Sequence, residues 1–484
     1  MNKTLIQKKG TPLWETCLWW IARVFLAVAV FTAPTTPKKL MVLFALAVTF
    51  LGSVLGKFIK NLSSHFQTCV CLTAVLGSGL GFGFDLFQLL PEYDVPLSLF
   101  GGIIGVAIGY YISIALRKPE TNKDFNFTAF ISFCVSCALI VPKEIIQFFT
   151  DYFTGRNLLH CEMPEDDHWL FSLVGTGGSM PEQWYLIDFS EDITLGIIGS
   201  FIATAVLYIY IRLKNKGAFI KEKIQFKISF RDIPSRFKAK AIYEIAKVKQ
   251  QTNIFDTLLW WSVRIVMLYA FLTMESRAEA TLLGAILVGT FAISIIHFVF
   301  PKESMFCKIN YRVQTLIVII AFLGSYCGNY VGVYAYASRF DTLLHFVSGF
   351  IGAAAGYYIA RTLVRPRSQK ENLVISLFAM SFALAIIPIH EMTEFIGDYI
   401  WGTTNQGFMW EPGDNVLIYR LFGHGVGNEL LIRIYDTMYD MSLASTTSIL
   451  SFFIILITLE RNRKNEKNSG QYNKTVTEKE KVTC

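Results

Sequence analysis

The second half of the chain carries acidic side chains and one histidine at helical spacing within three apolar segments. These residues are Asp341, His345, Glu391, Glu394, Asp398, Asp436 and Asp440. Residues three, four or seven positions apart share one face of a helix, so each segment would present its charges on a single face. Carboxylates and an imidazole are ligands of divalent ions such as Zn, Mn and Fe. The pattern therefore predicts a divalent metal site formed by these seven residues.

A metal ion held in this way can activate water or polarise a phosphoryl group, while a neighbouring carboxylate acts as general base. On this hypothesis the candidate catalytic residues are His345, Glu391 and Asp440. Six carboxylates close together would otherwise repel one another, because a partly dry site disfavours uncompensated charge.

Two simpler explanations cover part of this set. Asp341 and Asp436 stand where helices are expected to start, so each could be an N-cap that accepts free backbone N–H groups. Pairing with Arg339 or Arg433 is the second explanation. The N-cap explanation does not account for Asp440, Glu391 and Glu394, which fall a turn inside helices.

The segments that must position these residues are apolar runs of the length that crosses a bilayer. Hydrophobic residues make up 53% of the 484 residues, and charged residues 17%. Runs of about 20 residues predict membrane-spanning helices, because in lipid each backbone polar group must be paired within its own segment. The chain is therefore predicted to be an all-α polytopic membrane protein with about twelve helices. We expect these near residues 14–33, 40–60, 67–88, 96–116, 127–148, 193–211, 255–273, 281–300, 313–333, 343–363, 373–394 and 440–459.

Lys and Arg gather in five segments of the chain. These are the amino end and residues 117–124, 212–240, 364–370 and 461–474. The positive-inside rule places them in the cytoplasm with both termini, and it places the acidic segments 151–192 and 398–436 outside. The net charge of +7 therefore reflects membrane orientation and does not indicate nucleic-acid binding. We expect the bilayer itself to be the main partner, with a lipid or small molecule at the outer leaflet as substrate.

The chain repeats itself with an offset of 247 residues. Residues 93–112 align with 340–359, and residues 144–155 align with 391–402. Slightly further on, Asp192 matches Asp440 with one extra residue between the copies. This pattern predicts a tandem duplication of two parallel six-helix repeats. The expected domains are a first repeat at 1–212, a basic linker at 213–252, a second repeat at 253–460 and a polar tail at 461–484.

The first copy lacks part of the predicted site. Ser98 stands where the second copy has His345, and Gln147 stands where it has Glu394. The second repeat is therefore expected to hold the more complete site. A separate group in the first repeat, His160, Asp166, Asp167 and His168, is a weaker metal-site candidate.

Two further patterns concern packing and lipid contact. Glycines three and four apart, near residues 102–109 and 349–356, predict close packing of helices. The basic linker mixes Lys and Arg with Phe and Ile, which predicts a segment lying on anionic lipid head groups.

Three motifs carry a resemblance to a known family: 340-FDTLLHF-346, 391-EMTEF-395 and 435-YDTMYDM-441. With these motifs the second half resembles the bacterial membrane family typified by YjdF, and more loosely the VanZ-type proteins. The resemblance implies a multi-pass protein of the bacterial cytoplasmic membrane with its site at these motifs. It implies no particular reaction.

Three functions are compatible with the sequence. A metal-assisted enzyme acting on lipid or prenyl-phosphate head groups would use the acids and His345 near the outer surface. A secondary transporter or lipid translocase would use the carboxylates for ion coupling, although they lie at the rim and no half-helix break is evident. A non-catalytic scaffold or sensor is the third possibility.

Overall fold

The structure is a computed structural model that describes residues 11–59, 62–90, 93–117, 122–154, 187–214, 233–300, 306–337, 339–364, 366, 368–401 and 434–468. Within these ranges the regular elements are helices, and no strand occurs. The first half contains α1 (Leu13–Thr32), α2 (Thr36–Val48), α3 (Leu51–Phe58), α4 (Ser64–Thr73), the π-helix η1 (Ala74–Gly83), α5 (Leu86–Leu89), α6 (Asp94–Leu116), α7 (Asn122–Thr154) and α9 (Ile187–Lys214).

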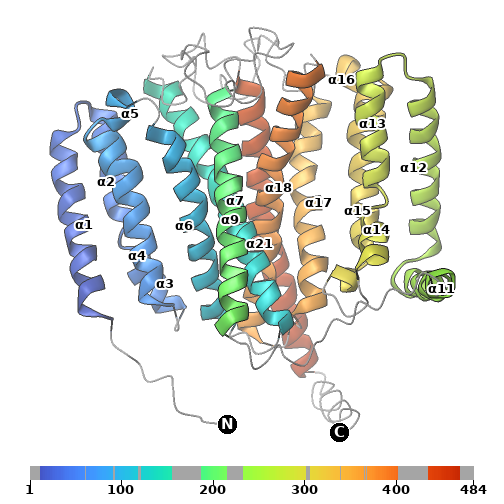
Figure 1. Ribbon diagram of the computed structural model, residues 1–484, viewed down its shortest axis with the longest axis horizontal. Helices are drawn as coiled ribbons and strands as arrows, with labels where there is room; N and C mark the ends of the chain where they lie inside the picture. Colours follow the sequence, from blue (N-terminus) through green and yellow to red (C-terminus); the bar gives the residue numbers. More distant parts are fainter. Residues whose placement is uncertain are drawn as a thin grey trace. The chain divides into compact units, whose positions relative to one another are not determined.

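The second half follows a similar order. It contains α11 (Ile233–Gln251), α12 (Ile254–Thr273), α13 (Arg277–Gly289), α14 (Ala292–Val299), the 3₁₀ turn η6 (Phe306–Lys308), α15 (Arg312–Ala321), the π-helix η7 (Phe322–Tyr330), α16 (Val333–Tyr336), α17 (Phe340–Leu363), α18 (Gln369–Trp401) and α21 (Tyr435–Asn468). Figure 1 shows most of these helices standing side by side within each half of the chain.

Eleven described helices are long and apolar enough to cross a membrane, or twelve if one bent pair forms a single span. This confirms the predicted all-α membrane class. The bent pair corrects one expectation, because residues 281–300 were predicted as a continuous helix without a break. Instead Glu279–Gly289 and Ala292–Val299 meet at 56°.

A contact from a neighbouring helix lies at this break, at Thr290. The Arg264 guanidinium on α12 donates to the Thr290 carbonyl at 2.6 Å and to its hydroxyl at 3.1 Å. A carbonyl engaged in this way is drawn out of the helical ladder, which is a common origin of kinks. The first half repeats the contact, because Arg23 donates to the carbonyl of Thr49 at 3.0 Å and to its hydroxyl at 3.3 Å, between α2 and α3.

Replacing Arg264 by lysine is expected to lower the free energy of unfolding by about 2 kcal/mol. The planar guanidinium makes two hydrogen bonds and stacks over the Phe291 ring, 3.7 Å from its centroid. The ammonium of lysine cannot make both hydrogen bonds and the stacking contact together. Chemical denaturation in detergent measures the change. Arg312→Lys is the control, since the exposed Arg312 donates to Tyr358 at 3.1 Å and its loss should stay within about 0.5 kcal/mol. Equal effects of the two substitutions would contradict the prediction.

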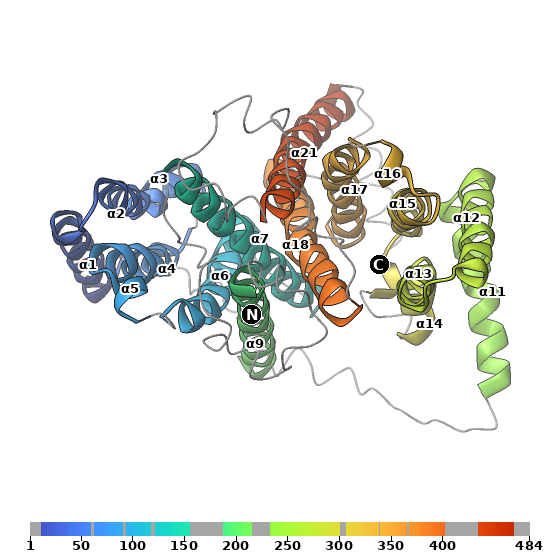
Figure 2. The ribbon, with the colours of Figure 1, turned by 90° about the horizontal axis from the view of Figure 1, so that it is seen from above.

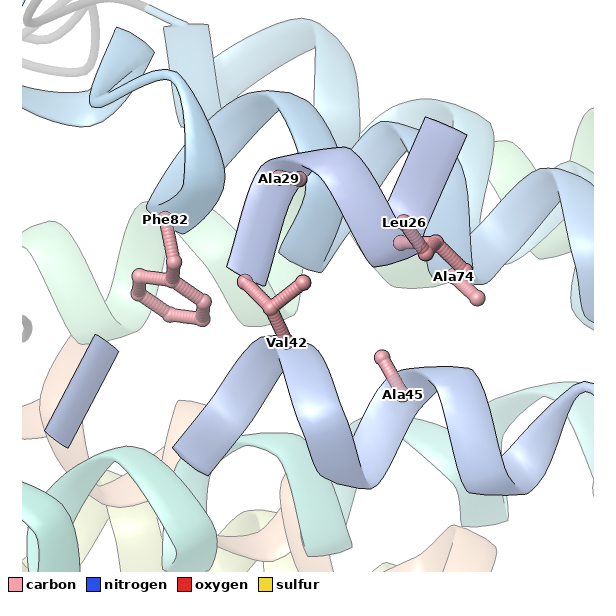
Figure 3. Close-up of a cluster of buried hydrophobic side chains, with 6 residues drawn as sticks. All are labelled: Leu26, Ala29, Val42, Ala45, Ala74 and Phe82. Carbon is pink, nitrogen blue, oxygen red and sulfur yellow. The ribbon is translucent and has the colours of Figure 1, made fainter. Parts of the chain in front are cut away.

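The described chain divides into two compact units. Unit 1 comprises residues 1–119, 128–210 and 388–438, and unit 2 comprises residues 120–127, 211–387 and 439–484. Unit 1 has a hydrophobic cluster where α1, α2 and η1 meet, formed by Leu26, Ala29, Val42, Ala45, Ala74 and Phe82 (Figure 3). Burying these side chains helps to fix the first helices against one another.

In unit 2 a glycine allows α17 to approach α21 closely. A Cβ atom at Gly349 would collide with the Ala444 carbonyl, the Thr447 hydroxyl and the Ser448 amide. Gly349 follows His345 by one helical turn, and Ala444 follows Asp440 by one turn. The predicted role of the glycines in close packing is therefore confirmed at this position, and the contact brings the charged turns of the two helices together.

Candidate metal centre

Three of the predicted ligands meet at one point in unit 2. Asp341 lies in the first turn of α17, His345 lies one turn further along, and Asp440 comes from α21. One ligand atom from each residue lies within 4.8 Å of the others. Asp341 and His345 share one face of α17 because they are four residues apart. The close approach of α21 to α17 at Gly349 brings Asp440 to the same point.

The separations match a shared cation better than ordinary hydrogen bonds. His345 Nε2 lies 3.3 Å from Asp440 Oδ2 and 3.6 Å from Asp341 Oδ1. Hydrogen bonds from nitrogen to oxygen usually measure about 2.7–3.2 Å, so both separations are long. Two ligands bound at about 2.0–2.1 Å to one tetrahedral metal lie about 3.4 Å apart. The donor set of one imidazole and two carboxylates also fits Zn, Mn or Fe.

The three side chains differ in their access to solvent. His345 and Asp440 are each 7% exposed, whereas Asp341 is 35% exposed. Two ligands are therefore held inside the protein and the third opens toward the surface. Three protein ligands leave coordination positions for water or a substrate oxygen, which is typical of catalytic rather than structural metal sites.

The N-cap explanation does not fit Asp341. Arg339 occupies the N-cap position of α17 and makes no side-chain capping bond, while Asp341 belongs to the first helical turn. Asp436 likewise lies in the first turn of α21, which begins at Tyr435.

The other four predicted ligands belong to unit 1. Glu391 and Asp398 on α18 are buried, at 1% and 0% exposure. Glu394 is half-buried and pairs with His390 at 3.3 Å, one turn before it on the same helix. The histidine at 390 was missed in the sequence, although its four-residue spacing to Glu394 was a usable signal. A role in metal binding for these four residues, Glu391, Glu394, Asp398 and Asp436, therefore stays a prediction.

The first half places a lysine among the residues that correspond to the centre. Lys143 on α7 pairs with Asp192 on α9, contacts Glu144 at 3.2 Å and donates to the Ser98 hydroxyl at 3.0 Å. Ser98 also donates to Asp192. Lys143 was missed in the sequence, although the offset of 247 residues aligns it with His390. An ammonium group thus compensates the acids here.

Several predicted features lie outside the described residues. These are the group His160, Asp166, Asp167 and His168, together with Arg433.

Substituting valine for Gly349 is expected to weaken metal binding by at least about tenfold, because the added side chain pushes α17 and α21 apart and moves His345 away from Asp440. Isothermal titration with Mn²⁺ or Zn²⁺ measures the change. Gly289→Ala is the control, because nothing lies within 4 Å of a Cβ atom at that position. Unchanged metal affinity in a folded Gly349→Val protein would contradict the role assigned to this contact.

Comparison with known proteins supports the membrane class. A family model described as "Predicted membrane protein (DUF2238)" matches residues 255–461. The matched region contains Asp341, His345 and Asp440, and it includes α12 to α18 and most of α21. No curated protein and no solved structure matches the chain. The second half is thus similar to an uncharacterised membrane family, as its motifs predicted, while the likeness to VanZ-type proteins stays a prediction.

Proposed function

We propose that this protein is a membrane-embedded, metal-dependent enzyme that acts on phosphate-bearing lipid or prenyl head groups. The observation that carries the proposal is the convergence of Asp341, His345 and Asp440 with spacings suited to one divalent ion. The positive-inside rule supports an outer location, because the basic segment 364–370 lies at the opposite end of α17. The amino end of α17, which carries Asp341 and His345, is therefore where head groups of the outer leaflet would meet the site.

Each residue of the centre has a distinct role in this proposal. His345 and Asp440 hold the ion from the buried side, while Asp341 completes the ligand set at the exposed side. A divalent ion bound here would supply Lewis acidity toward a phosphoryl oxygen and make bound water more acidic. Glu391 stays a candidate catalytic residue predicted from the sequence.

We infer that the two halves are a tandem duplication, and among the described residues only the second half groups side chains that could hold a metal ion. Equivalent contacts support the duplication: Trp19 donates to Thr68 and Trp260 to Thr315, each at 3.0 Å, and both halves contain a π-helix before a short helix. In the first half Lys143 supplies the positive charge that a metal would supply in the second. Within the described ranges this asymmetry leaves one position for an ion.

An assay of phosphate release tests the proposal. Purified protein in mixed micelles is given phosphatidic acid or a prenyl pyrophosphate with Mn²⁺, Zn²⁺ or Mg²⁺. The expected result is metal-dependent release of phosphate that the Asp440→Asn variant has lost. Absence of release from every substrate by a protein that holds its metal would contradict the enzyme hypothesis.

One observation favours a transporter as the second candidate. Lys143, Glu144 and Asp192 form a charged group within the membrane-spanning segments of unit 1, and such groups often mark ion pathways. The broken span at residues 279–299 also fits a transporter, since interrupted helices form their binding sites. Ion or lipid flux in proteoliposomes that Glu391→Gln abolishes would favour transport over catalysis.

A further inference from the structure

The amphipathic helix α11 is attached to unit 2 through one polar face. Four side chains at spacings of four, three and four residues form this clamp face: Lys240, Glu244, Lys247 and Gln251. These spacings place all four on one side of the helix. The remaining sides of α11 are therefore free of this attachment.

Each member of the clamp face contacts the end of α14 or the segment after it. Lys240 donates a hydrogen bond to the Phe300 carbonyl at 2.9 Å, and Gln251 Oε1 accepts a hydrogen bond from the Tyr311 amide at 3.0 Å. Glu244 Oε2 lies 3.1 Å from His297 Nδ1 and accepts a hydrogen bond from the Tyr311 hydroxyl at 3.0 Å.

Lys247, the fourth residue of the clamp face, donates a hydrogen bond to the Cys307 carbonyl and lies 3.2 Å from His297 Nδ1. Burial raises the pKa of Tyr311, which keeps its hydroxyl protonated as the donor to Glu244. These contacts hold α11 in a defined rotation about its own axis.

The orientation of α11 differs from that of the spans. Figure 1 shows α11 end-on near the lower end of α12, whereas α12 and α13 stand upright, and Figure 2, seen from above, shows α11 lengthwise. Residues 252–253 join α11 directly to α12. A helix that crosses the ends of membrane spans lies in the plane where head groups meet water.

The side of α11 opposite to the clamp face is apolar and basic. Ile242 and Ile245 are 59% and 58% exposed, and Lys249 on the same side is exposed too. The helix as a whole contains five Lys or Arg residues and one Glu. Its apolar surface continues onto the first turns of α12, where Ile254 and Phe255 are 66% and 75% exposed.

We propose that the outer face of α11, formed by Ile242, Ile245 and Lys249, binds the surface of an anionic lipid membrane. The clamp face fixes the rotation of the helix, so the isoleucines point toward lipid and the lysine meets negatively charged head groups. The exposed apolar residues of α12 show where the lipid contact continues. This inference is independent of the proposed metal chemistry.

Photo-crosslinking in the full-length protein tests the proposal. Benzoylphenylalanine replaces Ile245, and the protein is reconstituted into phosphatidylcholine vesicles with or without about a third of phosphatidylglycerol. We expect lipid adducts at position 245 and a yield about fivefold higher with phosphatidylglycerol, because each basic residue favours an anionic surface. The Lys249→Gln substitution in the same protein should remove most of that increase.

A matched position distinguishes a failed proposal from a failed experiment. Benzoylphenylalanine at Leu258, which is 56% exposed on the membrane-spanning α12, should give lipid adducts in both kinds of vesicle. If position 258 gives lipid adducts but position 245 gives none, or gives crosslinks to a second protein chain, the proposal is overturned. Equal yields at position 245 with and without phosphatidylglycerol also overturn it.

Discussion

The Asp440→Asn variant is expected to bind divalent metal at least about 100-fold more weakly than the natural chain. Asp440 is the only ligand of the described triad that α21 supplies, so the remaining pair on α17 cannot enclose an ion. The effect of losing a direct ligand should exceed that of losing an outer hydrogen-bond partner, which usually costs about 10- to 100-fold. Mass spectrometry of metal content and calorimetric titration measure the change.

Asp192→Asn is the matched control for this experiment. Asp192 aligns with Asp440 but pairs with Lys143, so its loss should leave one bound ion per chain. His345→Ala should reproduce the loss seen with Asp440→Asn, because both side chains belong to the same centre. If the natural chain binds no divalent ion, or if Asp192→Asn loses it equally, the assignment of the metal to unit 2 is wrong.

The second large effect is expected for Lys143→Met, which should lower the free energy of unfolding by about 3 kcal/mol. The substitution leaves Asp192 and Glu144, at 4% and 0% exposure, without their shared positive charge. Breaking a buried ion pair from one side usually costs about 3–5 kcal/mol, and a partly exposed lysine places this case at the lower end. Denaturation in detergent measures the loss.

Two companion variants give this prediction its control. Lys143→Met combined with Asp192→Asn should recover much of the stability, because one uncompensated charge is removed along with its partner. Lys39→Met, at an exposed lysine, should change stability by less than about 0.5 kcal/mol. A stable Lys143→Met single variant would show that the lysine does not neutralise these acids.

The local features of this protein could be predicted from its sequence. Membrane-spanning helices follow from runs of apolar residues, because the bilayer demands both a minimum length and internal backbone pairing. The pairing of Asp341 with His345 follows from their four-residue spacing, since any helix aligns such positions. The membrane class, and two of the three residues that could hold a metal ion, were therefore predictable without tertiary information.

Contacts between helices distant in sequence determined the position of Asp440 and the surroundings of the bend after Gly289. Asp440 joins the triad because Gly349 lets α21 approach α17, and a pattern within either helix does not specify that neighbour. At the bend after Gly289 the Thr290 carbonyl accepts a hydrogen bond from Arg264, which belongs to another helix. The hydropathy of residues 281–300 alone does not predict this bend.

The same distinction explains the residues that sequence reasoning missed. Lys143 stands next to Glu144 in an apolar run, and its contacts with Ser98, Glu144 and Asp192 show that it occupies a cation position. Spacing along one helix determines which side chains share a face. Which faces meet depends on packing between helices distant in sequence, and here that packing selected three of the seven predicted ligands as one cluster among the described residues.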